Sequence, residues 1–325
     1  MGQPGSPDPT AISRRADALL LANPGCLERH GVTIEQLVAL FEPHGLTVEG
    51  VALEGAPDVG ALRARIEAAG PNLVIAAGGD GTVHHVANAL VGLGRPMGVL
   101  PLGTANDFAR TMSLPTDLAD AVRVIAESSP IPVDLARVND AYFLNAAHVG
   151  LGVETAKRTN TTLKRMIGPI AYVLAAAQAW LTTEPMPIEI CVDDSCMRLM
   201  ASQVLVGNGR YYGGGNVVAP EATLDDGLLD VYVLSADASK AELLSLAAAA
   251  RTGTLGDQKH ILYYRTASLS ATVVGPVQIN VDGELMAMEG KLEFEVLPRA
   301  LAVYAPATPM DPVLTPESLV AKALS

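Results

Sequence analysis

The sequence predicts a two-domain α/β protein in which a parallel, Rossmann-like α/β domain precedes a mostly antiparallel β-sandwich domain. Apolar runs alternate with helically periodic segments in the first part of the chain, whereas β-type runs dominate the rest. The chain has 325 residues, of which 49% are hydrophobic, so it can fill two ordinary cores. We expect a disordered tail over residues 1–15, domains over 16–137 and 138–302, and a C-terminal segment over 303–325 that packs back on the first domain.

Strand-length apolar runs and helical spacing predict the elements of the first domain. The expected strands cover residues 18–21, 46–53, 73–77 and 97–100, and the expected helices cover 33–44, 59–69 and 83–93. Such alternation is typical of a parallel sheet covered on both faces, and ligands bind such sheets at the carboxyl ends of the strands. Three loops that follow strands should therefore crowd one edge of the sheet: residues 23–25, 78–82 and 101–107.

β-type runs predict the second domain. Strands are expected at residues 141–147, 188–192, 202–207, 228–234, 268–274, 277–281 and 291–297, with helices at 161–181, 239–251 and 315–324. Asp193-Asp194-Ser195 is typical of a hairpin turn, which favours antiparallel pairing. The edges of an antiparallel sheet could pair across a homodimer.

The charge balance limits the partners of the chain. The formal net charge is −13 and the sequence pI is about 4.8, so no nucleic-acid partner is expected. One basic cluster is either a solvated helix face or a small patch for anionic lipid: Lys157, Arg158, Lys164 and Arg165. We therefore expect at most a transient contact with a membrane surface.

Cysteine usage and hydropathy predict a cytoplasmic protein. Cys26, Cys191 and Cys196 have no zinc-site spacing, and their odd number favours free thiols in a reducing compartment. The N-terminus lacks the basic start and apolar run of a signal peptide. The longest apolar stretch, residues 170–181, is too short to span a bilayer.

The first motif is the loop Gly78-Gly79-Asp80-Gly81-Thr82, which follows a strand and opens a helix. Glycine permits positive φ and the close approach of a phosphate to backbone amides, and the helix N-terminus favours an anion. Asp80 would repel a phosphate, so its expected task is to hold Mg²⁺. The pattern is neither a P-loop nor a dinucleotide fingerprint, and by itself it could equally be an ordinary strand–helix turn.

The second motif spans residues 101–110 and places Thr104, Asn106 and Asp107 directly after a strand. Thr104 could bond a phosphate oxygen, Asn106 a ribose or the substrate, and Asp107 the hydroxyl of the substrate. The alternative is a turn into a helix that is capped by Asn106 or Asp107.

Taken together, the two motifs closely resemble the catalytic family of diacylglycerol kinases, which includes bacterial lipid kinases and the sphingosine and ceramide kinases. The resemblance spans residues 16–305 and continues through further ordered segments: Asn23-Pro24-Gly25, Pro132-Val133-Asp134, residues 142–145, residues 213–220, residues 226–230 and residues 281–284.

This resemblance implies an ATP- and Mg²⁺-dependent kinase that phosphorylates a lipid with a free hydroxyl, most simply a diacylglycerol-like lipid. The nucleotide would rest on Asn23, Pro24, Gly25, Gly78, Gly79, Asp80, Gly81, Thr82, Thr104 and Asn106. Glu284 would be the general base, with Asp80 and Asp107 as further catalytic residues. Locally, however, Asp282-Gly283 is also an ordinary hairpin turn that would leave Glu284 solvated.

The resemblance also implies two metal sites. Asp80 and Asp134 would support the catalytic Mg²⁺. Asp226, with the carbonyls of Thr223 and Leu228, would match a structural metal site of bacterial members, although a plain Asp-Gly turn explains Asp226 nearly as well.

One residue departs from the family pattern, because His85 stands where the family usually has Glu. The departure leaves two other functions open. A soluble-substrate kinase of the NAD-kinase-like superfold shares the glycine loop but not the second motif. A catalytically weak, lipid-binding regulatory protein would be consistent with the altered residue.

Overall fold

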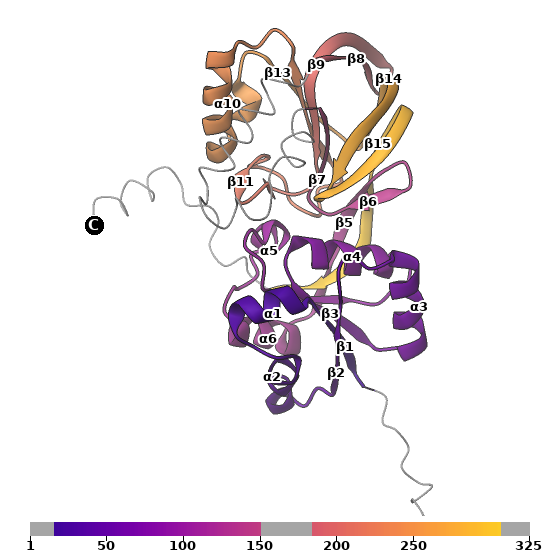
Figure 1. The fold of residues 1–325 in the computed structure, drawn as a ribbon, viewed down its shortest axis with the longest axis vertical. Coiled ribbons are helices and arrows are strands. Elements are labelled where there is room, and N and C mark those ends of the chain that lie inside the picture. Colours follow the sequence, from indigo (N-terminus) through magenta and orange to yellow (C-terminus); the bar gives the residue numbers. More distant parts are fainter. Residues whose placement is uncertain (1–15, 151–183, 307–325) are drawn as a thin grey trace, which may run out of the picture.

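The computed structural model describes residues 16–150 and 184–306. The expected tail, the basic cluster and the expected helices at 161–181 and 315–324 lie outside these described residues. The described chain forms two domains stacked along the long axis of the molecule (Figure 1). The predicted α/β architecture with a β-rich second domain is confirmed.

A parallel sheet forms the centre of the first domain. Its strands lie in the order β2-β1-β3-β4, with bounds β1 (Ala18–Ala22), β2 (Val48–Ala52), β3 (Leu73–Gly78) and β4 (Met97–Pro101). Neighbouring strands in this set run parallel. Every residue of β1, β3 and β4 is buried, because helices cover both faces of the sheet. This burial explains their continuous apolar sequences.

Helices pack against the two faces of this sheet. One face contacts α3 (Val59–Ala69) and α4 (Asp80–Leu90), and the other contacts α1 (Pro24–His30), α2 (Ile34–Ala39) and α6 (Leu118–Glu127). The expected helix at 33–44 is α2 followed by the 3-10 helix η1 (Glu42–His44), and α5 (Asp107–Thr111) follows β4. Two helices, α1 and α6, were not predicted from the sequence. α1 begins directly after Asn23, whose side chain caps it.

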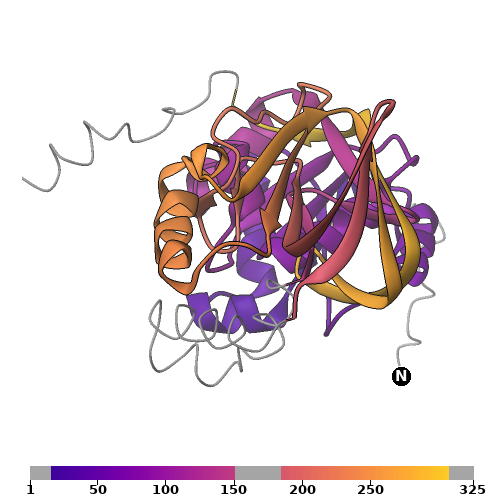
Figure 2. The same ribbon diagram turned by 90° about the horizontal axis from the view of Figure 1, so that it is seen from above.

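The second domain is an antiparallel β structure with an apolar core of its own. Its strands are β5 (Pro130–Val138), β6 (Ala141–Phe143), β7 (Ala146–Gly150), β8 (Met186–Val192), β9 (Ser195–Gly207), β10 (Tyr211–Tyr212), β11 (Asn216–Val217), β12 (Leu229–Ser235), β13 (Ile261–Thr266), β14 (Ser268–Val281) and β15 (Glu284–Tyr304). Seen from above, these strands curve around the core, while α10 (Lys240–Thr252) lies to one side (Figure 2). A 3-10 helix, η2 (Leu255–Asp257), follows α10.

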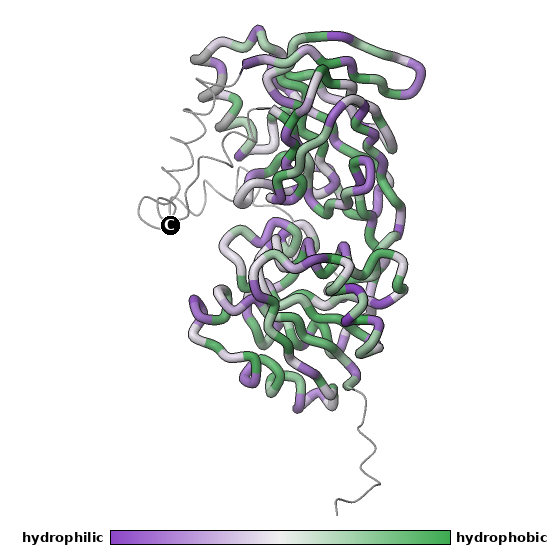
Figure 3. The backbone as a smooth tube through the Cα atoms, turned by 45° about the vertical axis from the view of Figure 1, so that its right-hand side comes forward, coloured by the Kyte–Doolittle hydropathy of each residue, from purple (hydrophilic) through white to green (hydrophobic). Residues whose placement is uncertain are grey.

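Two long strands tie the domains together. β15 pairs with β14 in the second domain, and its far end pairs with β4 of the first domain through Val303 and Met97. β5 pairs antiparallel with β15 along most of the length of β5. Residues 303–306 of the expected C-terminal segment therefore lie on the first domain. Figure 3 shows hydrophobic segments running through both domains, and the buried apolar residues of the strands form the two cores.

The expectation of free thiols is wrong for two of the three cysteines. Cys191 and Cys196 form a disulfide across the β8–β9 hairpin, where the two residues are direct cross-strand partners. Cys26 is free and buried. Within the described residues, no helix has the length and apolarity needed to cross a bilayer.

Candidate active site between the two domains

The three loops predicted to share one sheet edge do meet there. They follow β1, β3 and β4, which are adjacent parallel strands. Asn23 N–H donates to the carbonyl of Ala77 over 2.9 Å, and Leu102 N–H donates to the carbonyl of Gly78 over 2.8 Å. The carboxyl ends of the strands thus present one continuous rim.

Glycines allow two of these loops to touch. A Cβ on Gly79 would lie 3.1 Å from Cα of Gly103, and one on Gly103 would lie 2.5 Å from Cα of Gly79. A Cβ on Gly78 would lie 2.3 Å from Oγ1 of Thr82. None of these glycines has positive φ, so the freedom of glycine to adopt positive φ is not used at these three positions. Glycine is required at these positions because a Cβ would collide with the neighbouring loop or with Thr82.

The glycine loop opens the helix α4 without a side-chain cap. α4 begins at Asp80 directly after Gly79, and no side chain hydrogen-bonds to its N-terminus. The first N–H groups of a helix have no intrahelical partner, and the helix dipole favours an anion at this end. Phosphate oxygens are suitable partners for these groups.

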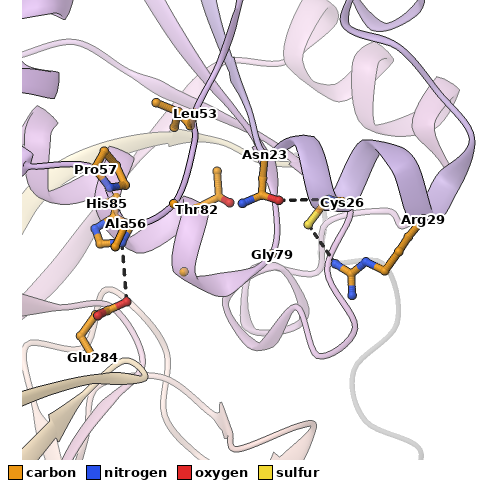
Figure 4. A pocket seen from close by; sticks show the side chains of 12 residues that line it. Asn23, Cys26, Arg29, Leu53, Ala56, Pro57, Gly79, Thr82, His85 and Glu284 are labelled. Atoms are coloured by element: carbon orange, nitrogen blue, oxygen red, sulfur yellow. Dashed lines mark hydrogen bonds and ion pairs between the residues drawn. The ribbon is translucent and has the colours of Figure 1, made fainter. Parts of the chain in front are cut away.

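A pocket of about 400 Å³ opens in front of this helix end. It is lined from the first domain by Asn23, Cys26, Arg29, Leu53, Gly55, Ala56, Pro57, Gly79, Gly81, Thr82 and His85, and from the second domain by Glu284. Figure 4 shows Glu284 pointing from its strand towards His85, while Asn23 lies at the start of α1 and Arg29 lies on α1 beside Cys26. Apolar and polar walls thus enclose the predicted phosphate loop and the predicted base together.

Arg29 is a pocket residue that the sequence analysis missed. Its Nε donates to the carbonyl of Gly25, and its two terminal nitrogens donate to Oγ1 of Thr104 over 3.3 Å and to Sγ of Cys26 over 3.0 Å. The signal was present, because Asn followed by Pro is typical of a helix N-cap and first position. A helix starting there places Arg29 on the turn beside the pocket.

The second motif forms a self-bonded turn. Asn106, at φ 52°, accepts from Gly103 N–H over 2.9 Å and donates to the Gly103 carbonyl over 3.0 Å. The side chain of Asn106 is therefore engaged in its own turn, and although Asn106 directly precedes α5, its side chain makes no capping hydrogen bond to that helix. Thr104 is exposed and accepts from Arg29.

Asp107 connects the two domains by hydrogen bonds. Its carboxylate accepts from Gly214 N–H over 2.9 Å and from Gly215 N–H over 2.6 Å. Both glycines have positive φ, which turns their amides towards the first domain. Burial raises the pKa of Asp107, while these two hydrogen bonds oppose the shift.

Asp80 lies in a crowded acidic environment. Its pKa is raised to about 6, first by burial and then by the charges of Asp107 and Asp282, although Phe108 N–H donates to its carboxylate. Buried like charges favour the binding of a cation, and carboxylate oxygens are ligands that Mg²⁺ prefers. The chemistry of these residues therefore fits a Mg²⁺ held by Asp80.

These carboxylates do not form an all-protein metal cage. Among the described residues, a three-ligand group is found only at Glu189, Cys191 and Cys196, where the cysteines are consumed by their disulfide. Mg²⁺ is commonly held by one or two carboxylates together with substrate phosphates. A single carboxylate beside the phosphate loop is sufficient for that arrangement.

The two other carboxylates predicted as metal ligands, Asp134 and Asp226, are bonded to protein groups. Asp134 is buried, and its two oxygens accept from Gly227 N–H and Arg299 N–H over 2.8 Å each. The structure therefore gives Asp134 a scaffold role where β5 meets β15.

Asp226 is neutralised by an arginine. Its carboxylate accepts from the N–H groups of Thr223 and Leu228, and Arg265 lies 2.6 Å away. Arg265 also lies 3.4 Å from Asp230. The guanidinium already supplies positive charge to this turn, so the donor set does not favour a metal there.

Asp282 anchors the turn that precedes the predicted base, Glu284. Its carboxylate accepts from the consecutive N–H groups of Leu144, Asn145 and Ala146 over 2.6, 2.9 and 3.0 Å. His84 Nδ1 lies 3.2 Å from the same carboxylate. The predicted turn 282–283 is present between β14 and β15, but Asp282 is a buried anchor rather than a solvated turn residue.

Glu284 follows this anchor and reaches the pocket. Its side chain is 46% exposed, and Oε1 lies 3.6 Å from Nε2 of His85. The predicted base and the predicted phosphate loop are thus brought to one pocket from different domains.

A Rossmann-like domain with a glycine-opened helix, facing a carboxylate from a β-sandwich domain, defines a two-domain kinase. Residues 17–138 match the model of the diacylglycerol kinase catalytic domain, and residues 146–305 match that of the YegS C-terminal NAD kinase beta sandwich-like domain. The chain belongs to the diacylglycerol kinase family.

Curated relatives agree with this assignment. A probable lipid kinase YegS-like of Pseudomonas aeruginosa is 35% identical over 243 residues, which is 74% of this chain and 78% of that protein. A diacylglycerol kinase of Staphylococcus saprophyticus is 31% identical over 278 residues, which is 84% of this chain and 90% of that protein.

Solved structures show the same fold. A diacylglycerol kinase structure from Bacillus anthracis has a TM-score of 0.66 at 22% identity, covering 91% of this chain and 98% of that one. An NAD kinase from Archaeoglobus fulgidus in complex with ATP has a TM-score of 0.52 at 12% identity, covering 89% and 94%. At these identities the likeness concerns the fold alone.

Proposed function

We propose that this kinase transfers the γ-phosphate of ATP to the hydroxyl of a lipid, with a diacylglycerol-like lipid as the acceptor. The observation that supports this proposal is that Glu284 and the loop at Gly79 line one pocket from opposite domains. The names of the relatives, lipid kinase and diacylglycerol kinase, support the class of acceptor.

In the proposed reaction, the first N–H groups of α4 and the guanidinium of Arg29 bind the triphosphate. Asp80 would hold Mg²⁺, which neutralises charge on the phosphates when it is bound. Glu284 takes the proton of the acceptor hydroxyl. The hydroxyl oxygen then bonds to the γ-phosphorus, while the bond between the γ-phosphorus and the oxygen that bridges to the β-phosphate breaks. The products are a lipid phosphate and ADP, and Glu284 then returns its proton to solvent.

The position of Glu284 indicates how a lipid acceptor would enter the site. The hydroxyl must reach Glu284 on the second domain, so the lipid is proposed to enter between the domains during a transient contact with a membrane surface. The net charge of −13 argues against attraction by anionic headgroups as the driving force. A homodimer formed through sheet edges of the second domain stays a proposal.

The function is tested by a panel of diacylglycerol, phosphatidylglycerol, sphingosine and NAD, each incubated with ATP and Mg²⁺ and analysed by mass spectrometry. We expect a phosphorylated lipid and unmodified NAD, and we expect Glu284→Gln to lower kcat by about 10²-fold or more. Phosphorylated NAD would favour the soluble-substrate alternative. An absence of ATP turnover with every acceptor would favour a lipid-binding regulatory protein.

Arg29 is predicted to bind the nucleotide rather than to act in the chemical step. Arg29→Ala should raise the KM for ATP about 10-fold with little change in kcat, because a charge-assisted contact present before and during transfer contributes about 1.5–3 kcal/mol. The measurement is steady-state kinetics with varied ATP. Arg65→Ala, on the exposed face of α3, is the matched control. A fall in kcat at unchanged KM would contradict the assignment.

A further inference from the structure

Two consecutive histidines of α4 contact two residues of the catalytic turn. His84 Nδ1 lies 3.2 Å from Oδ2 of Asp282, and His85 Nε2 lies 3.6 Å from Oε1 of Glu284. The histidine rings meet edge to face with centroids 5.4 Å apart. The helix that opens at the phosphate loop therefore also contacts the turn that carries the base.

The surroundings of His85 leave one nitrogen for this contact. Its side chain is 12% exposed, and its Nδ1 is buried with no hydrogen-bond partner. Burial, followed by the neighbouring His84, lowers the pKa of His85, and Glu284 opposes the shift. The ring is therefore neutral near pH 7. Because the carboxylate of Glu284 accepts hydrogen bonds, the nitrogen that faces it, Nε2, carries the proton and donates towards Glu284.

Glu284 needs such a partner. Its side chain is almost half exposed, and the described residues provide no other hydrogen bond or ion pair to its carboxylate. A free glutamate side chain would sample several rotamers and would rarely face an acceptor hydroxyl. A contact of 3.6 Å is slightly longer than a hydrogen bond, but such contacts in unliganded sites commonly shorten when substrate binds.

We propose that His85 is the positioning residue of Glu284, holding one carboxylate oxygen through its Nε2–H so that the other oxygen faces the acceptor hydroxyl. This inference rests on the proposed function of Glu284 as the base. His84 and Asp282 fix the turn itself, and His85 then fixes the side chain. Because α4 also carries the phosphate loop, a single rigid helix sets the distance between the transferred phosphate and the base.

Three variants of His85 test the proposal. His85→Met fills a similar volume without a donor and should lower kcat about 30-fold at an unchanged KM for ATP, because a misplacement of the order of 1 Å can cost about 10²-fold. His85→Gln, whose amide nitrogen can occupy the place of Nε2, should retain kcat to within a few fold. His85→Asn, whose amide lies at the place of Nδ1, should resemble Met and replaces it if the Met variant does not fold.

A double-mutant cycle separates this inference from the function on which it rests. In the Glu284→Gln background, His85→Met should cause no further loss, because the residue it positions is already absent. An equal loss in both backgrounds, or full kcat for His85→Met alone, would show that His85 does not act through Glu284. Full activity of Glu284→Gln by itself would instead overturn the proposed base.

Discussion

Asp282→Ala is expected to lower the free energy of unfolding by about 4 kcal/mol, because a buried carboxylate that accepts several hydrogen bonds is lost. Three consecutive N–H groups, from Leu144 to Ala146, would lose their acceptor, and His84 would lose its partner. The same change should reduce kcat by about 10²-fold or more, since Glu284 lies two residues beyond the anchor and would no longer be held at the pocket.

Asp193→Ala is the matched control for this prediction. Asp193 also occupies a turn at positive φ, 50° against 48° for Asp282, but it is exposed on the β8–β9 hairpin. Both variants pay the cost of placing alanine in the left-handed region, about 1 kcal/mol, and only Asp282→Ala loses the buried network. The measurement is the urea midpoint of both variants. Equal midpoints would show that the network contributes nothing beyond the turn.

Asp282 also shows where prediction from sequence stops. Val281-Asp282-Gly283-Glu284 is locally a hairpin turn, and the turn is present. The hydrogen-bond partners of Asp282, however, lie 136 to 138 residues earlier, and His84 lies 198 residues earlier. No local pattern encodes contacts at such separations, so the sequence indicated the turn and not its anchoring role.

The rim of the first sheet was predictable because a simple topological rule governs it. Apolar strands separated by helices imply parallel neighbours, and the residues after each strand then fall at one edge. Asn23, Gly79 and Leu102 lie there as predicted. The structure of the segment after β1 was not predictable in the same way. Asn23 caps a helix, α1, which is too short for its apolar residues to show a helical period.

Local interruptions misled the analysis of the second domain. Gly275 and Pro276 divide an apolar run, so two strands were expected where β14 is continuous through a bulge. The disulfide was accessible to reasoning, because a turn at 193–194 makes Cys191 and Cys196 direct partners. The odd cysteine count favours free thiols only as an argument about the compartment, and it says nothing of which cysteines lie opposite each other.

Asp80→Asn is expected to stabilise the protein, because it removes a charge that is costly to bury when no cation is bound. The same change should lower kcat by about 10³-fold, because the carboxylate that would hold Mg²⁺ for the transition state is lost. The pKa of Asp80 is about 6 in the folded state against an ordinary value of 3.8 for an aspartate. The folded protein therefore binds more protons than the unfolded chain between these values, and the contribution of Asp80 to stability is lost as pH rises from about 4 to 6. Above that window the buried charge costs about 2–3 kcal/mol.

Asparagine removes this charge and retains the oxygen that accepts from Phe108 N–H. The Tm of Asp80→Asn should therefore equal that of the wild type near pH 4 and exceed it by about 3–6 °C at pH 8. Mg²⁺ at millimolar concentration should raise the Tm of the wild type and leave that of the variant unchanged, since a ligand stabilises only the state that binds it. Asp58→Asn, at the exposed N-cap of α3, should show neither effect. A variant that is less stable than the wild type at pH 8 would mean that Asp80 is paired within the protein, and that its carboxylate does not await a cation.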